Sequence, residues 1–238
     1  MRIHALALAA LASILVAGCA VDGTEEEADD ANAEPASSEG ALRVTGFVEP
    51  RLSATERANV LAKYDNVDDG GVIPKKLLED ALVFFDANKS KITNKNYLTV
   101  VDFSKHSGKK RFFLIDMRTG SVQSHVVAHG SGSDADNNGT AEKFSNLSGS
   151  NASSLGYYLT AEIYSGKHGR SMRLDGLSDT NYRARDRAVV VHTASYVKEG
   201  NSKQGRSWGC LVLDEDVKDA IVDKIKGGSV IYAGLSSS

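Results

Sequence analysis

The chain has 238 residues, of which 41% are hydrophobic and 25% are charged. These proportions exclude collagen-like, wholly disordered and multi-span membrane proteins, and two cysteines cannot form a disulfide scaffold. The formal net charge of −3 averages two unlike regions: residues 20–40 carry eight acids and no base, whereas 27 basic and 23 acidic residues follow from residue 41 onward. This mild basic excess suits an anionic polymer but is too weak to predict a nucleic-acid partner.

The first residues are typical of an exported bacterial lipoprotein. A basic start at Arg2 precedes an apolar run over residues 5–16, which is the length of a signal-peptide core and too short for a transmembrane helix. The string Leu15-Val16-Ala17-Gly18-Cys19 resembles a bacterial lipobox, in which the cysteine becomes the lipidated first residue of the mature protein. We therefore expect a lipoprotein signal peptide over residues 1–18 and a lipid on Cys19, with plain secretion as the alternative.

The residues after Cys19 predict how the protein is held at the membrane. Ala20 rather than aspartate follows the cysteine, so resemblance to enterobacterial sorting favours the outer membrane, facing the periplasm, over the inner membrane. Residues 19–43 are rich in Glu, Asp, Ala and Ser and show no apolar periodicity. Such a segment cannot bury enough apolar area to offset the entropy of ordering it, so it predicts an acidic, disordered tether.

The remaining chain predicts two helices followed by a mostly antiparallel β body. Ser53 and Glu56 form a capping-box pattern at the start of a helix over residues 52–64, and Pro74 opens a second helix over residues 74–88. Six short β-branched or aromatic runs separated by Gly, Asn, Asp and Ser predict strands at 97–103, 111–116, 122–128, 156–164, 188–192 and 229–233. Residues 214–226 predict a last amphipathic helix. The expected fold class is mainly β (α+β).

Cys210 is the only cysteine of the folded body and is either a buried apolar residue or a reactive thiol. It follows a Gly- and Ser-rich loop and leads into an apolar run, and Gly209 permits the close backbone approach that an oxyanion site needs. His192 ends a strongly β-forming run, which would hold its imidazole on a rigid strand. A Cys–His pair is the minimum for an activated thiolate, so the two residues predict nucleophilic catalysis.

Here the sequence resembles the YkuD-type family of murein L,D-transpeptidase catalytic domains. That family carries a histidine, roughly a dozen and a half residues, and then Ser/Thr-X-Gly-Cys; here His192-Thr193 is followed by Ser207-Trp208-Gly209-Cys210. Further strings resemble a Gly- and Ser-rich branch of the family, in the order Val127–Gly132, Phe144–Asn146, Ser153–Thr160, Tyr164–Lys167 and Leu174–Leu177. The resemblance implies a catalytic domain over residues 97–238, preceded by an N-terminal helical segment over residues 44–96.

The resemblance also implies roles for individual residues. Cys210 is the nucleophile, His192 is the general base, and the backbone carbonyl of Thr193 orients the imidazole. The amides of Gly209 and Cys210 are the candidate oxyanion donors. Trp208 departs from the wider family, which has histidine directly before Gly-Cys, and this puts any role for a second histidine in doubt.

Other residues are candidate substrate contacts. Arg206 could bind a substrate carboxylate in a bidentate way, or it could be a solvated loop charge. Ser207 and Trp208 lie in the same loop. Tyr157, Tyr158 and His129 are further candidates, with packing or structural roles as the alternatives. Residues 134–139 resemble the first positions of a calcium loop, but Ser145 stands where a glutamate is needed, so neither a metal nor a cofactor is predicted.

The resemblance implies an enzyme that acts on the stem peptides of peptidoglycan. Cys210 would form a thioester with the donor stem after loss of its terminal D-Ala, and an amine of another stem would resolve it into a cross-link. With water as the acceptor the protein would be an L,D-carboxypeptidase. A sortase-like transpeptidase is disfavoured by the short His-to-Cys spacing and by the lack of an arginine soon after Cys210. A non-catalytic wall-binding lipoprotein is the alternative from a different class.

Overall fold

The computed structural model describes residues 44–237, so the predicted signal peptide, Cys19 and the whole of the predicted tether lie outside the described residues. Within the described part, no helix is long and apolar enough to cross a membrane. The strands are β1 (Tyr97–Asp102), β2 (Phe112–Asp116), β3 (Val122–His125), β4 (Gly156–Gly166), β5 (Gly169–Gly176), β6 (Val190–Thr193), β7 (Leu211–Leu213) and β8 (Val230–Gly234). The helices are α1 (Ala54–Leu61), α2 (Lys75–Asn88) and α3 (Glu215–Ile225), with 3₁₀ turns η1 (Ala62–Tyr64) and η2 (Ser131–Ser133).

The eight strands form one sheet in the order β3-β2-β1-β8-β4-β5-β6-β7. Neighbouring strands are antiparallel except for β1 with β8 and β6 with β7, which are parallel. The segment after β3 returns to the far edge of the sheet, where Ala128 forms an antiparallel bridge with Val212 of β7. The sheet is therefore nearly closed, and the two edges meet close to the predicted nucleophile.

The structure confirms the mainly β fold class and the mostly antiparallel arrangement. The expected capping box is present, because Ser53 Oγ accepts from the Glu56 amide while Glu56 accepts from the Ser53 amide. The sequence analysis missed β5, although Met172 and Leu174 alternate with polar residues in the period of a strand. Strand β7 was predicted only as an apolar run, because a strand of three residues carries little periodicity.

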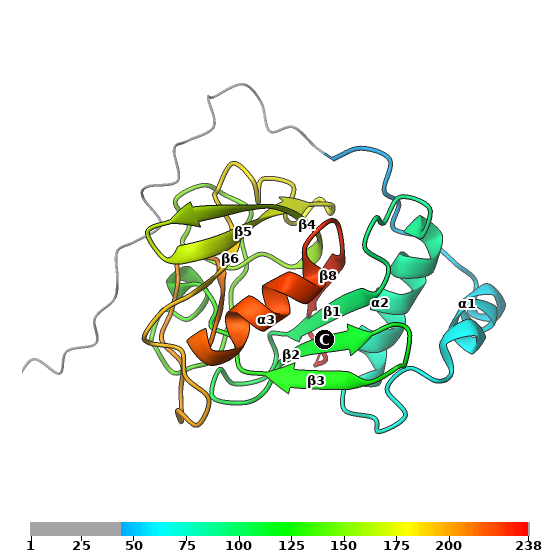
Figure 1. The fold of residues 1–238 in the computed structure, drawn as a ribbon, viewed down its shortest axis with the longest axis horizontal. Coiled ribbons are helices and arrows are strands. Elements are labelled where there is room, and N and C mark those ends of the chain that lie inside the picture. The colour runs from blue at the N-terminus through cyan, green and yellow to red at the C-terminus, as the bar shows by residue number, and fades with distance from the viewer. Residues whose placement is uncertain (1–43, 238) are drawn as a thin grey trace, which may run out of the picture.

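Helix α2 covers one face of the sheet beside β1, as Figure 1 shows. Its residues Leu77, Ala81 and Phe84 pack against Leu98 and other apolar residues of β1, β2, β4 and β8 in one core cluster. The domain boundary predicted before residue 97 therefore separates α2 from the strands with which it shares a core. Burial of this apolar face fixes α2 to the sheet, and the cost of removing one aromatic ring from such a core is about 3–5 kcal/mol.

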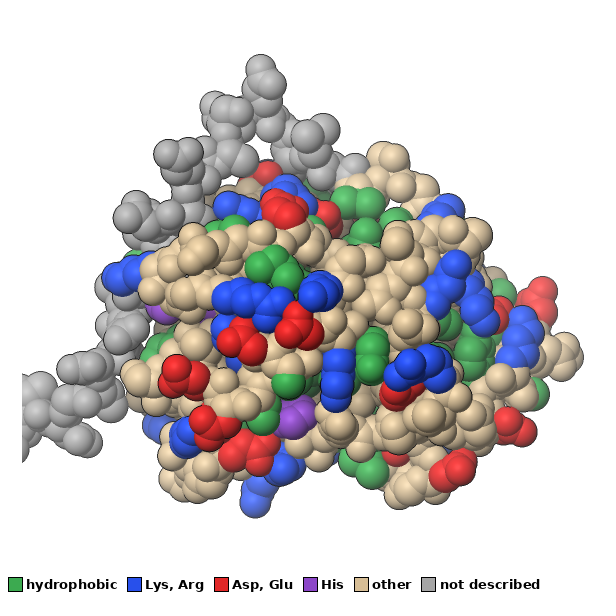
Figure 2. Space-filling model, viewed as in Figure 1, with side chains coloured by type: hydrophobic (Ala, Val, Ile, Leu, Met, Phe, Trp, Pro, Cys, Tyr) green, Lys and Arg blue, Asp and Glu red, His purple; other side chains and the backbone are tan. Residues whose placement is uncertain are grey.

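Helix α3 packs against the other main cluster of buried residues, where Ile221, Val222 and Ile225 contact apolar side chains of the sheet. On the face seen in Figure 2, basic and acidic side chains are interspersed. The surface of the described residues also carries exposed ion pairs, such as those that Arg170 forms with Asp219 and Asp223. Exposed pairs of this kind contribute little stability.

Candidate active site

Three loops meet at the Cys210 end of the sheet and pack backbone against backbone. They comprise residues 128–133, residues 145–154 and residues 205–210. The Ser207 amide donates to His129 O at 2.9 Å, and the Ser131 amide donates to Ser207 O at 2.7 Å. A Cβ at Gly130 would lie 2.2 Å from Asn151 O. The glycines of this region therefore permit the close packing of the loops.

The parallel pairing of β6 with β7 places His192 and Cys210 on one face of the sheet. His192 is opposite Val212 in the register, and Cys210 lies two residues before Val212, so both side chains point to the same side. Cys210 and Val212 pack in one cluster with Val190 and Ala194, which lie two residues before and two residues after His192. The structure thus brings together the two residues that the sequence singled out for catalysis.

His192 is held by its own strand. Its Nδ1 lies 2.9 Å from the backbone oxygen of Thr193, so Nδ1 carries the proton and donates to that carbonyl. The hydrogen bond that the sequence analysis expected from Thr193 is present, and it leaves Nε2 as the nitrogen that can exchange a proton. The ring of His168, from the β4–β5 turn, lies over the His192 ring with 4.3 Å between centroids and 35° between planes. Nothing in the spacing of the sequence pointed to His168.

The thiol of Cys210 is buried, with 1% of the residue exposed, and His192 is equally buried. The sulfur donates to the backbone oxygen of Ala188 at 3.6 Å. Ala188 itself has a φ of 53°, in the left-handed region that a residue with a Cβ rarely adopts. A substrate carbonyl can reach the sulfur only after neighbouring side chains move.

Gly209 and Ser207 shape the turn that carries the thiol. Gly209 has a φ of +118°, and a Cβ there would lie 2.8 Å from Ala152 O. Its amide donates to Ser207 Oγ at 3.1 Å, and that hydroxyl donates to Cys210 O at 2.9 Å. In this conformation the Gly209 amide is bound inside the loop, and Ser207 is buried and braces the turn. Gly209 contributes through its backbone conformation.

Arg206 and Trp208 are half-buried residues of the same loop. The Arg206 guanidinium donates to the backbone oxygen of Asp134 and so holds the loop of residues 134–139. Trp208 stands directly before Gly209, at the position where the wider family has histidine. The part of the chain that the structure describes has no group of three or more His, Cys, Asp or Glu side chains arranged to hold a metal ion.

His129, a predicted substrate contact, lies in a buried network. It is fully buried; its Nδ1 accepts from Arg111 Nη2 at 2.7 Å, and its Nε2 donates to Asp134 Oδ2 at 3.1 Å. Burial, together with the neighbouring charge of Arg111, lowers the pKa of His129 to about 4. His129 is therefore neutral at pH 7 and braces the loop whose carbonyl binds Ser207. This is the structural alternative that the sequence left open.

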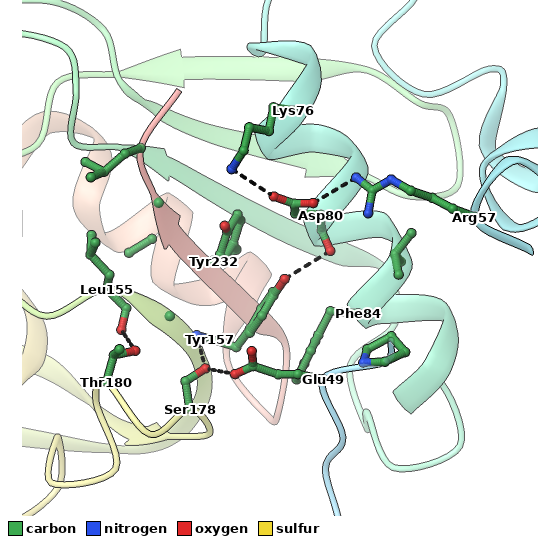
Figure 3. A pocket seen from close by; sticks show the side chains of 16 residues that line it. Glu49, Arg57, Lys76, Asp80, Phe84, Leu155, Tyr157, Ser178, Thr180 and Tyr232 are labelled. Atoms are coloured by element: carbon green, nitrogen blue, oxygen red, sulfur yellow. Dashed lines mark hydrogen bonds and ion pairs between the residues drawn. The ribbon is translucent and has the colours of Figure 1, made fainter. Parts of the chain in front are cut away.

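Tyr157 and Tyr158 are also packing residues. Figure 3 shows Tyr157 in a pocket of about 470 Å³ between α2 and the sheet, a pocket whose lining includes neither Cys210 nor His192. There Tyr157 stacks on Phe84 with 3.7 Å between centroids and donates to Asp80 O at 3.1 Å. Tyr158 is 2% exposed and donates to Ser154 O at 2.7 Å. Alternation along β4 sends the two rings to opposite faces, so they cannot line one cleft.

Arg187 is a second residue beside the thiol that the sequence analysis missed. It directly precedes Ala188, whose carbonyl binds the sulfur, and its Nη2 lies 3.0 Å from where a Cβ would stand at Gly209. Its other contacts are with the loop of residues 145–154. In the sequence, the only signal for Arg187 is its position just before the strand of His192. An arginine at that position belongs to no recognisable motif.

The sequence matches the L,D-transpeptidase catalytic domain over residues 70–233, which is more than half of the chain. The chain belongs to this family. The match begins before α2, in agreement with the core that α2 shares with the sheet. A comparison with curated proteins found no match.

Solved structures with some similarity include L,D-transpeptidases. One from Mycobacterium smegmatis is 14% identical with a TM-score of 0.37, and 58% of each chain is covered. One from Xylanimonas cellulosilytica is 14% identical with a TM-score of 0.36, covering 58% of this chain and 60% of that one. Bd1075 from Bdellovibrio bacteriovorus is 13% identical with a TM-score of 0.37, covering 61% of this chain and 49% of that one. The chain thus spans less than two thirds of each, and the family assignment rests on the sequence match.

Proposed function

We propose that the protein is an L,D-transpeptidase that modifies peptidoglycan by a thioester mechanism at Cys210. The observation that carries the proposal is the placement of Cys210 and His192 on one face of β6 and β7, with the His192 ring oriented by Thr193 O at 2.9 Å. A histidine held in one tautomer beside a thiol is the arrangement that activates a cysteine nucleophile. Membership of the L,D-transpeptidase catalytic-domain family supports the substrate class.

In the first half-reaction His192 takes the proton from Cys210 Sγ through Nε2. The thiolate attacks the carbonyl carbon of the third residue of a stem tetrapeptide. Collapse of the tetrahedral intermediate breaks the bond to the terminal D-Ala, which leaves as an amine after it receives a proton from His192. The Cys210 amide is the oxyanion donor we propose, because the Gly209 amide is bound to Ser207 Oγ at 3.1 Å.

In the second half-reaction an amine of another stem attacks the thioester. His192 accepts a proton from this amine, a new amide bond forms, and Cys210 is released. Water in place of the amine would give an L,D-carboxypeptidase by the same steps. The choice depends on which acceptor the opened cleft admits, and both routes require Cys210 and His192.

The proposal is tested by digesting purified wall sacculi with the protein and weighing the released muropeptides. New cross-links between third residues indicate transpeptidation, and tripeptides without new cross-links indicate carboxypeptidase activity. Cys210→Ser should abolish turnover, and His192→Ala should reduce it by about a hundredfold or more, as loss of a general base does. Unchanged muropeptide profiles with either variant would contradict the proposal and favour a non-catalytic wall-binding protein.

We further propose that the protein is anchored to the outer membrane by a lipid on Cys19, facing the periplasm. This proposal rests on the lipobox-like string that ends at Cys19 and on Ala20 after it. Several acyl chains, at about 0.8 kcal/mol per buried methylene, give stable anchoring. The acidic residues 20–40 would then separate the catalytic domain from the membrane surface by self-repulsion.

A further inference from the structure

Arg187 is a half-buried cation whose hydrogen-bond acceptors are all neutral oxygens. Its guanidinium donates to the backbone oxygens of Ser145 at 2.7 Å and Ala152 at 2.5 Å. Weaker contacts reach the hydroxyls of Ser154 at 3.3 Å and Ser150 at 3.4 Å. Within residues 44–237, no carboxylate pairs with this side chain.

Its neighbour in the same turn behaves differently. Arg185, two residues earlier, pairs with both Glu162, at 2.7 Å and 3.0 Å, and Asp175. A guanidinium that is partly withdrawn from water and bound only by neutral groups is costly unless a negative charge lies near it. The arrangement around Arg187 therefore calls for an anion in the active form of the protein.

The group that can supply this charge is Cys210. Nη2 of Arg187 lies 3.0 Å from the position of a Cβ at Gly209, the residue before Cys210, and Ala188 O binds the sulfur at 3.6 Å. Burial lowers the pKa of Arg187, and negative charge on Tyr158 or Cys210 opposes that effect. The interaction is reciprocal, so the guanidinium favours the thiolate over the thiol.

We propose that Arg187 is a positioning residue of the nucleophile, which stabilises the Cys210 thiolate and ties the loop of residues 145–154 to the catalytic turn. This inference rests on the proposed role of Cys210. When the S–H bond of Cys210 breaks and an N–H bond forms on His192, the negative charge on the sulfur is stabilised by both the imidazolium and the guanidinium of Arg187. Arg187 thereby keeps the thiol ready to react although it is buried.

Several titratable groups surround the sulfur besides Arg187. His192 lies on β6 and is covered by His168 of the β4–β5 turn. Tyr158 lies on β4, and burial raises its pKa. Tyr164 and Tyr196 pack against the cluster that contains Cys210. Because all of these stay in place in an Arg187 variant, the effect of Arg187 is the difference between that variant and a matched control.

The test uses the full-length protein and iodoacetamide, with the rate of modification at Cys210 followed by peptide mass over a range of pH. Peptide mapping separates Cys210 from Cys19. Arg187→Gln should raise the midpoint pH of alkylation by about one unit or more, which makes modification about tenfold slower below the midpoint. Arg185→Gln removes the same charge from the same turn, and its midpoint should match the natural protein.

The outcomes separate an electrostatic role from a structural one. A midpoint in Arg187→Gln equal to that in Arg185→Gln would overturn the proposal, even if the variant were less thermally stable. If circular dichroism shows that Arg187→Gln does not fold, Arg187→Lys decides: a folded lysine variant should keep the natural midpoint, and a rise of a full unit would contradict a charge effect. Since alkylation needs no substrate, this result is independent of whether Cys210→Ser abolishes turnover.

Discussion

Acidification should destabilise the fold through His129. This side chain is fully buried and lies between Arg111 Nη2 at 2.7 Å and Asp134 Oδ2 at 3.1 Å. Arg111 is always a donor, so His129 must present an unprotonated Nδ1 to it. Protonating both nitrogens would set two cations against each other inside the protein. The network therefore requires neutral His129.

The magnitude follows from the two pKa values. Burial first, and the charge of Arg111 second, lower the pKa of His129 to about 4 in the folded protein, against about 6.5 in the unfolded chain. Between these values the unfolded chain binds a proton that the folded protein does not, so stability is complete above about pH 6.5 and is lost as the pH falls toward 4. A difference of about 2.5 units corresponds to about 3 kcal/mol in total.

Urea unfolding at about pH 7.5 and pH 5 measures this loss, which should be about 2 kcal/mol from His129 alone. Asp134 adds nothing in this window, because its pKa is lowered below the usual value of 3.8. The control is His129→Gln, which cannot titrate: it should be less stable at both pH values but lose about 2 kcal/mol less on acidification. Equal losses in the two proteins would refute the reasoning.

Three further changes have distinct expected results. Gly209→Ala should lower the free energy of unfolding by about 1–3 kcal/mol and slow alkylation of Cys210, because φ is +118° and the new Cβ would lie 2.8 Å from Ala152 O. If the variant were as stable as the natural protein in thermal unfolding, the turn would not be constrained. Phe84→Ala should cost about 3–5 kcal/mol in urea unfolding but leave Cys210 alkylation unchanged. Cys19→Ala should release the protein into the soluble periplasmic fraction, and complete retention with membranes would contradict the lipid anchor.

A carbapenem should acylate Cys210, because a strained carbonyl reacts with a thiolate that has oxyanion donors beside it. Intact mass should rise by one drug molecule, and the adduct should map to Cys210. Trp208 beside the thiol can slow drugs with large side chains, so several carbapenems are compared. Labelling by iodoacetamide but by no carbapenem would indicate a reactive thiol in a closed cleft, and labelling by neither would contradict the enzyme assignment.

The sequence predicted those features of the fold that depend on local patterns. The capping box at Ser53, the proline before α2 and the apolar faces of the helices are set by residues close together in the chain. The position of His192 at a strand end before a Gly- and Ser-rich loop likewise led to the Cys–His pair. Strand β7 was not predicted, because a strand of three residues carries little periodicity. Its pairing with β6 depends on tertiary structure, which local sequence patterns do not show.

The burial and the hydrogen-bond partners of the site residues are not visible in the sequence. His129 and Ser207 are polar residues in flexible-looking, glycine-rich strings, which favours contact with a substrate, yet both are used to brace one loop against another. Arg187 and His168 carry no motif, and they reach the site only because the β4–β5 turn and the turn before β6 pack beside the thiol.

The most direct test of the account is to trap the acyl-enzyme. The full-length protein is mixed with a stem tetrapeptide that lacks an acceptor amine, quenched in acid, and its intact mass is measured. The account predicts an added mass equal to that of the tetrapeptide minus that of the released D-Ala, mapped to Cys210 and missing from Cys210→Ser. Release of D-Ala by Cys210→Ser at the natural rate, or an adduct on another residue, would contradict it.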